Sequence, residues 1–122
     1  MAAGHQYTLL AAVCDFGWGS LGKLRLILDR LRATEVSLYG DGGINRTAVD
    51  LLGARHTFVQ RSPRHADIAL VINDPAAANR IADLGVPVIY VDSLPYLWAT
   101  EAEIPDRGKA ACYCAQKFPF DR

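Results

Sequence analysis

The alternation of short apolar runs with segments of helical periodicity constrains the fold of this chain most strongly. Residues 7–13 form an apolar run with little alternation, which is typical of a strand covered on both faces. Leucines then recur at helical spacing and predict a helix over residues 21–31. The same order repeats: strands are predicted at 35–40, 55–60, 66–72, 86–91 and 109–115, and helices at 44–52 and 75–84.

Strands that alternate with helices predict an α/β fold, a Rossmann-like three-layer sandwich with helices on both faces of a mostly parallel sheet. We expect five or six strands in a single domain that spans residues 1–122. Right-handed crossovers place 35–40 on one side of 7–13 and 66–72 on the other side. The sheet then has a switch point between 7–13 and 66–72, where open α/β sheets bind ligands.

The charge balance argues against a general nucleic-acid binder, because 13 basic and 13 acidic residues give a formal net charge of 0. No apolar run is long enough to span a bilayer, and the first six residues lack the features of a signal peptide. A cytoplasmic location is therefore expected. Three cysteines give no disulfide framework. Cys112 and Cys114 are expected to share one face of a strand, as small buried residues.

The segment from Cys14 to Lys23 joins the first strand to the first helix through a glycine-rich turn. In this geometry backbone N–H groups and a helix N-terminus meet a ligand. Ser20 is the predicted N-cap of the helix. Gly17, Gly19 and Gly22 otherwise serve only a tight turn and close packing of helix on sheet.

Polar residues follow the ends of the predicted strands and are expected to line one edge of the sheet. They are Asp15, Asp41, Asn73, Asp74, Asp92 and Ser93. Local backbone needs explain Asp74, as the cap of a helix that starts at Pro75, and Asp41, as part of a turn. Helix capping and turn formation explain Asp15 and Asp92 least well among these carboxylates. No histidine falls in these loops, and no metal-ligand motif is present.

Three other interpretations of the chain remain open. The spacing of Gly17, Gly19 and Gly22, with Asp41 about twenty residues on, also fits a dinucleotide-binding fingerprint, although Trp18 is bulky for close approach of a pyrophosphate. Cys14 at a strand end, facing backbone N–H groups, fits a phosphocysteine carrier. A non-catalytic interaction domain is the third alternative.

The glycine-rich segment Gly17-Trp18-Gly19-Ser20-Leu21-Gly22-Lys23 resembles the first loop of the N-terminal domains of GT-B glycosyltransferases. Residues 91–98, Val-Asp-Ser-Leu-Pro-Tyr-Leu-Trp, resemble the acceptor-side loops of the same class. Gln116-Lys117-Phe118-Pro119 corresponds to the loop after the last strand. The similarity extends over nearly the whole chain in the order of its strands and helices.

The resemblance implies an acceptor-binding half that becomes a hexosyltransferase only with a second domain. That domain, or a partner subunit, holds the nucleotide-sugar donor, so no cofactor is expected in this chain. The implied contacts to a small-molecule acceptor are Gly17, Trp18, Gly19, Ser20, Asn73 and Ser93. Ser20 stands where many members of the family carry a catalytic histidine, and a serine hydroxyl is a poor general base. The catalytic base is then expected to be Asp15 or Asp92.

Overall fold

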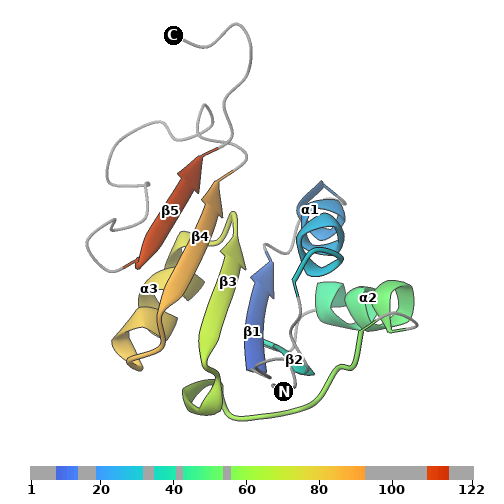
Figure 1. Ribbon diagram of the computed structural model, residues 1–122, viewed down its shortest axis with the longest axis horizontal. Helices are drawn as coiled ribbons and strands as arrows, with labels where there is room; N and C mark the ends of the chain where they lie inside the picture. The colour runs from blue at the N-terminus through green and yellow to red at the C-terminus, as the bar shows by residue number, and fades with distance from the viewer. Residues whose placement is uncertain are drawn as a thin grey trace, which may run out of the picture.

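A computed structural model describes residues 8–13, 19–31, 35–40, 43–53, 56–92 and 110–115. Within these ranges the chain forms an all-parallel sheet of five strands with three α-helices and one 3-10 turn (Figure 1). The strands are β1 (Thr8–Val13), β2 (Glu35–Leu38), β3 (Ile68–Ile72), β4 (Val88–Asp92) and β5 (Cys112–Ala115). The helices are α1 (Gly19–Leu28), α2 (Gly43–Leu52) and α3 (Pro75–Asp83), and the 3-10 turn η1 is Pro63–His65.

The strands lie in the order β2-β1-β3-β4-β5. Leu9 of β1 is paired with Val36 of β2 on one side and with Ile68 of β3 on the other. The chain therefore leaves β1 in one direction and later returns to its opposite side. This order confirms the predicted α/β sandwich and its switch point between β1 and β3.

The prediction of a strand at 55–60 is wrong, because the described residues of this segment form no extended strand. Phe58 forms a single parallel bridge with Val36. The N–H of Val36 donates to the carbonyl of Thr57 at 2.9 Å, and the N–H of Val59 donates to the carbonyl of Val36 at 2.9 Å. Pairing stops there because β2 is four residues long and offers little backbone to an outer neighbour.

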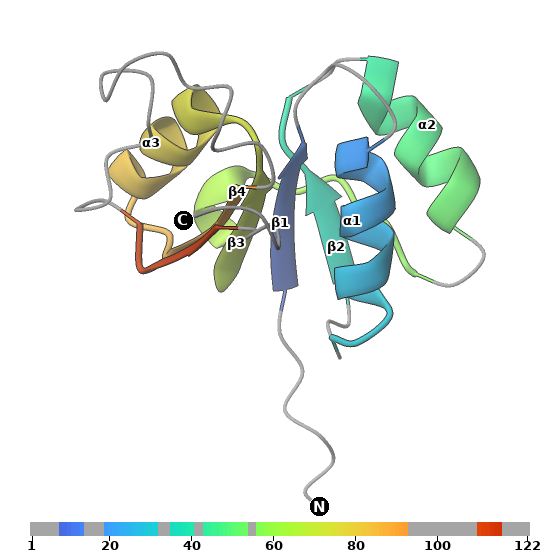
Figure 2. The same cartoon turned by 90° about the horizontal axis from the view of Figure 1, so that it is seen from above.

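The helices cover the two faces of the sheet unequally. Helices α1 and α2 lie on one face, next to β1 and β2, and α3 lies on the other face (Figure 2). Under α1 and α2 a buried cluster includes Leu24, Leu28 and Leu52. Under α3 a second cluster includes Ile81 and Tyr90, both 0% exposed. Both faces of the sheet are therefore apolar, which explains the unbroken apolar runs of β1 and β3.

The helix ends follow local sequence signals in one case and depart from them in another. Asp74 caps α3, because its Oδ1 accepts from the N–H of Ala77 at 3.1 Å, and Pro75 is the first residue of the helix. Both features were predicted. Helix α1 begins at Gly19, so Ser20 lies in its first turn and the prediction of Ser20 as N-cap is wrong. In the described part of the chain no helix is both long and apolar enough to cross a membrane.

Candidate functional site

The switch point brings the carboxyl ends of β1 and β3 together at one edge of the sheet. Val13 and Ile72 are paired at the last register position of these strands. The next residues of both strands therefore leave the sheet at the same edge. Of the predicted site residues that follow, Asp15, Gly17, Trp18 and Ser93 lie outside the described residues, and their functions stay predictions.

The glycine-rich segment is described from Gly19 onward, where it forms the first turns of α1. Gly19 and Ser20 thus lie at the start of this helix, close in sequence to the end of β1. Gly22 is exposed, and a Cβ added there would meet no atom within 4 Å. The close helix–sheet packing expected at Gly22 is therefore absent. This removes the packing function that a dinucleotide-binding fingerprint assigns to its third glycine.

Asn73 makes the turn from β3 into α3. Its φ of 57° lies in the left-handed region, which asparagine tolerates better than most residues. Its N–H donates to the carbonyl of Val91 at 3.0 Å, and the residue is only 4% exposed. Asn73 therefore ties the end of β3 to the end of β4, and Asp74 directly after it caps α3.

Asp92, the last residue of β4, is a fully buried carboxylate. The hydroxyl of Tyr113 on β5 donates to its Oδ2 at 2.5 Å. The ring of Tyr113 also stacks on Tyr90, with centroids 5.6 Å apart and planes 14° from parallel. A buried carboxylate is tolerated only when donors compensate its lost hydration. The carboxylate of Asp92 is thus held at the strand end by the neighbouring strand.

Tyr113 was not among the site residues predicted from the sequence. Side chains alternate along a strand, so Tyr113 lies on the face opposite Cys112 and Cys114, toward α3. This alternation was the sequence feature that could have identified Tyr113. The sequence did not show that β5 pairs with β4, and this pairing places Tyr90 opposite Tyr113. Asp92 and Asn73 come together at the edge as predicted, and the catalytic function of Asp92 stays a prediction.

A second polar contact links α3 to the end of β2. The Nε of Arg80 donates to the hydroxyl of Tyr39 at 3.2 Å, and the guanidinium carbon lies 6.0 Å from the centroid of the Tyr39 ring. The hydrogen bond to Tyr39 raises the pKa of Arg80 above its ordinary value. Asn45 of α2 donates to the carbonyls of Tyr39 and Gly40 at 3.1 and 2.8 Å. These contacts fix the carboxyl end of β2.

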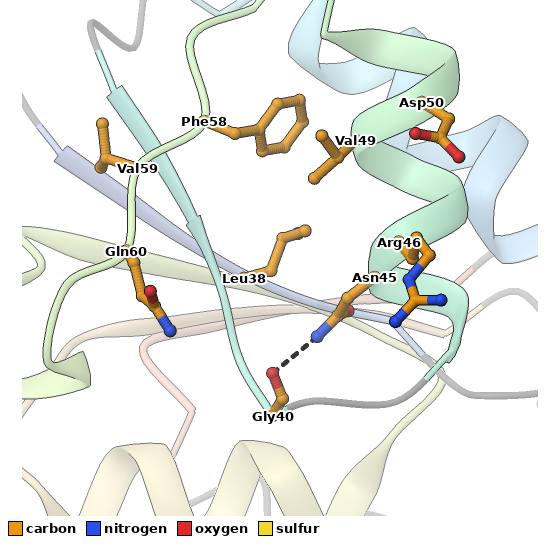
Figure 3. A pocket seen from close by; sticks show the side chains of 9 residues that line it. All are labelled: Leu38, Gly40, Asn45, Arg46, Val49, Asp50, Phe58, Val59 and Gln60. Carbon is orange, nitrogen blue, oxygen red and sulfur yellow. Dashed lines mark hydrogen bonds between the residues drawn. The ribbon is translucent and has the colours of Figure 1, made fainter.

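A cavity of about 450 Å³ lies between α2 and the segment that carries Phe58 (Figure 3). Leu38, Val49 and Phe58 form its apolar part. Its polar part consists of Asn45, Arg46, Asp50 and Gln60. The cavity lies beside the outer strand β2, whereas the switch point lies on the other side of that strand, between β1 and β3.

A larger groove of about 640 Å³ lies on the α1 face of the sheet. The residues that line it are Leu9, Ile27, Leu31, Asp67, Ile68, Leu70, Ile89, Val91 and Cys114. Helices α1 and α2 lie beside β1 and β2, and no described helix covers this face of the sheet beside β4 (Figure 2). We call this feature the apolar groove.

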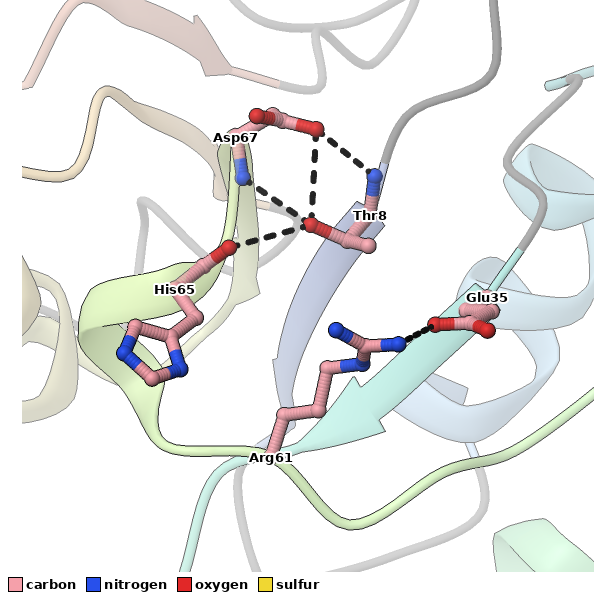
Figure 4. A network of polar contacts seen from close by, with 5 residues as sticks. All are labelled: Thr8, Glu35, Arg61, His65 and Asp67. Carbon is pink, nitrogen blue, oxygen red and sulfur yellow. Dashed lines mark hydrogen bonds and ion pairs between the residues drawn. The ribbon is translucent and has the colours of Figure 1, made fainter.

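The opposite edge of the sheet, at the amino ends of the strands, is held by a polar network (Figure 4). Oδ2 of Asp67 accepts from the N–H of Thr8 at 2.9 Å, and the Thr8 hydroxyl donates to the carbonyl of His65 at 3.2 Å. Arg61 forms an ion pair with Glu35. These contacts join β1, β2 and the segment before β3, so they are structural and remote from the switch point.

The two described cysteines depart from expectation in one respect. Cys112 and Cys114 share a face of β5, as predicted, and their Sγ atoms are 3.6 Å apart. Both are exposed, so the prediction that they are buried is wrong. The reason is that β5 is the outermost described strand and no described helix covers this face beside it. Among the residues that the structure describes, no cluster of three His, Cys, Asp or Glu side chains is arranged to hold a metal ion.

Comparison with known proteins finds no matching protein-family model, curated protein or solved structure. The features of the molecule that bear on function are therefore its fold, the residues at the carboxyl edge of the sheet and the sequence resemblance of the glycine-rich segment.

Proposed function

We propose that this chain is the acceptor-binding half of a GT-B-type glycosyltransferase. The observation that carries the proposal is the strand order, which brings the carboxyl ends of β1, β3 and β4 to one edge beside a switch point. Ligands of open α/β sheets bind at such an edge. The resemblance of residues 17–23 to the first loop of these enzymes supplies the class of reaction.

In the proposed reaction a carboxylate accepts the proton of an acceptor hydroxyl as that oxygen attacks the sugar donor. Asp15 and Asp92 are the candidates. The burial of Asp92 and its bond with Tyr113 favour a positioning function for Asp92. Asp15 is the second residue after the end of β1 and is the proposed base.

The proposed acceptor is a small hydroxylated molecule, bound by Gly17, Trp18, Gly19, Ser20, Asn73 and Ser93. The nucleotide-sugar donor belongs to a second domain outside these 122 residues, either in a longer protein of which they are part or on a partner subunit. The proposed location of the protein is the cytoplasm. On this proposal the chain alone binds acceptors and transfers no hexose.

Calorimetric titration of the purified chain tests this proposal. A panel of phenolic and alcoholic acceptors, nucleotide-sugars, NAD and inorganic phosphate is added in separate experiments. We expect binding of at least one acceptor and no binding of nucleotide-sugars. Tight binding of NAD would instead indicate a stand-alone dinucleotide-binding domain, and the glycosyltransferase proposal would be abandoned.

Two variants with matched chemistry sharpen the test. Asp15→Asn is expected to leave acceptor binding largely unchanged and to abolish transfer when a donor-binding domain is supplied. Asp83→Asn removes a carboxylate at the last residue of α3 and is expected to leave both binding and transfer unchanged. Equal transfer by the two variants would show that Asp15 is not the base.

A further inference from the structure

The thiols of Cys112 and Cys114 form a pair that the proposed glycosyl transfer does not use. Both side chains are exposed, and their Sγ atoms lie 3.6 Å apart on one face of β5. They are separated by one residue, so alternation along the strand keeps both on the same side. Two exposed thiols at contact distance are a potential chelating pair.

The separation of the sulfur atoms fits a tetrahedral ion. A zinc–thiolate bond is about 2.3 Å long, so two sulfurs 3.6 Å apart subtend an angle of about 103° at the ion. The ideal tetrahedral angle is about 109°, the geometry that Zn²⁺ adopts in proteins. Both thiols can therefore bind one ion with little movement of the strand.

A disulfide fits the same pair less well. It requires the sulfurs to approach to about 2.05 Å and the Cα atoms to lie within about 6.8 Å. Residues i and i+2 of a strand are already about 6.6 Å apart at the Cα atoms, near the upper limit of that range. Closing the bond would distort β5, which is paired with β4 from Cys112 to Ala115.

We propose that Cys112 and Cys114 form a two-thiolate binding site for a thiophilic divalent cation of the Zn²⁺ type. Binding breaks two S–H bonds, forms two sulfur–metal bonds and releases two protons to solvent, without oxidation or reduction. Among the residues that the structure describes, these two thiols are the protein ligands of the proposed site, because no group of three His, Cys, Asp or Glu side chains is found there. Soft thiolate ligands select such cations over Mg²⁺ and Ca²⁺.

Titration of the reduced full chain with Co²⁺, a spectroscopic substitute for Zn²⁺, tests the site. We expect one Co²⁺ per chain, with a thiolate-to-cobalt charge-transfer band that Zn²⁺ displaces and Mg²⁺ does not. Cys112→Ser and Cys114→Ser are each expected to weaken binding by at least about tenfold, because a single thiolate remains. Cys14→Ser is the matched control and is expected to retain both the band and the affinity.

Three results would overturn the site. The first is a reduced chain that shows no charge-transfer band. The second is a band that survives in both the Cys112→Ser and Cys114→Ser variants while Cys14→Ser loses it. The third is one ion shared by two chains, which would make the site a property of a dimer. Circular dichroism of each variant separates loss of a ligand from loss of the fold, and both substituted side chains are exposed.

Discussion

At the scale of single residues, the contact between Asp92 and Tyr113 determines how the candidate edge is organised. Asp92 is fully buried and ends β4, while Tyr113 approaches it from β5. The hydroxyl of Tyr113 donates to a carboxylate, and hydrogen bonds to charged groups are stronger than those between neutral groups. The sequence allowed Asp92 to be predicted at the edge, but its donor depends on the pairing of two strands more than twenty positions apart.

Replacing Tyr113 with phenylalanine isolates the hydroxyl, because the ring that stacks on Tyr90 is retained. We expect Tyr113→Phe to lower the free energy of unfolding by about 1–3 kcal/mol, since a buried carboxylate loses a donor. Urea denaturation measures the change. Tyr39→Phe removes the hydroxyl that accepts from the exposed Arg80, and it is expected to cost less. Equal costs for the two variants would contradict the importance assigned to the buried contact.

The pKa of the Cys114 thiol is raised, first by partial burial of its sulfur and then by the hydrogen bond with Cys112. A raised pKa keeps the thiol protonated to higher pH, and the thiolate is the reactive form. With a chelator present, alkylation of Cys114 by iodoacetamide is therefore expected to rise at higher pH than alkylation of the same residue in the unfolded chain. Peptide mapping at a series of pH values measures both rates.

The variant Cys112→Ala removes the neighbouring thiol that contributes to this pKa shift. It is expected to lower the pKa of Cys114 and to speed its alkylation severalfold near neutral pH. In urea the wild-type chain and the variant should react at the same rate. A folded variant that reacts more slowly than the wild type would mean that the neighbouring thiol does not suppress the thiolate.

At the scale of elements, the strands that are buried on both faces were the ones predicted best. The observed strands β1 and β3 contain no charged residue, so composition and length were enough to predict them as buried strands. Residues 55–60 looked similar in outline but carry Arg55, His56 and Gln60. Among the described residues of this segment, Phe58 forms a single bridge with Val36. The sequence did not predict this, because the length of the neighbouring strand β2 is a tertiary property. The same limit applies to Cys112 and Cys114, whose exposure depends on the position of β5 in the sheet.

The cap of α3 gives the sharpest prediction for an element. Asp74→Ala removes the acceptor for the N–H of Ala77 and is expected to cost about 1 kcal/mol of stability. Ser62 is the matched control, because it occupies the cap position of η1 but its side chain makes no capping hydrogen bond. Ser62→Ala is therefore expected to be nearly neutral in thermal or urea denaturation. A neutral Asp74→Ala would show that the capping bond contributes nothing to stability.

At the scale of the whole molecule, the path of the chain from β2 to β3 creates the switch point, and the placement of the described helices leaves the apolar groove uncovered. That path crosses from one side of β1 to the other and so creates the switch point. Helices α1 and α2 lie beside β1 and β2, so no described helix covers the same face beside β4, where the apolar groove lies (Figure 2). The order of the strands could be predicted from the handedness of crossovers. The uncovered face could not be predicted, because the sequence indicates the connections but not which part of the sheet each one covers.

This unequal coverage predicts that isoleucines on the two faces of the molecule differ in what they contribute to stability. Ile81 of α3 is 0% exposed inside the core on one face, and Ile89 of β4 lines the apolar groove on the other. Ile81→Ala is expected to cost about 2–5 kcal/mol, the usual result of emptying a closed core. Ile89→Ala removes the same atoms from a half-buried position, and its cost is expected to be roughly half as large, because part of its surface already contacts water. Denaturation of both variants under identical conditions measures the difference, and equal costs would show that the groove is closed in solution.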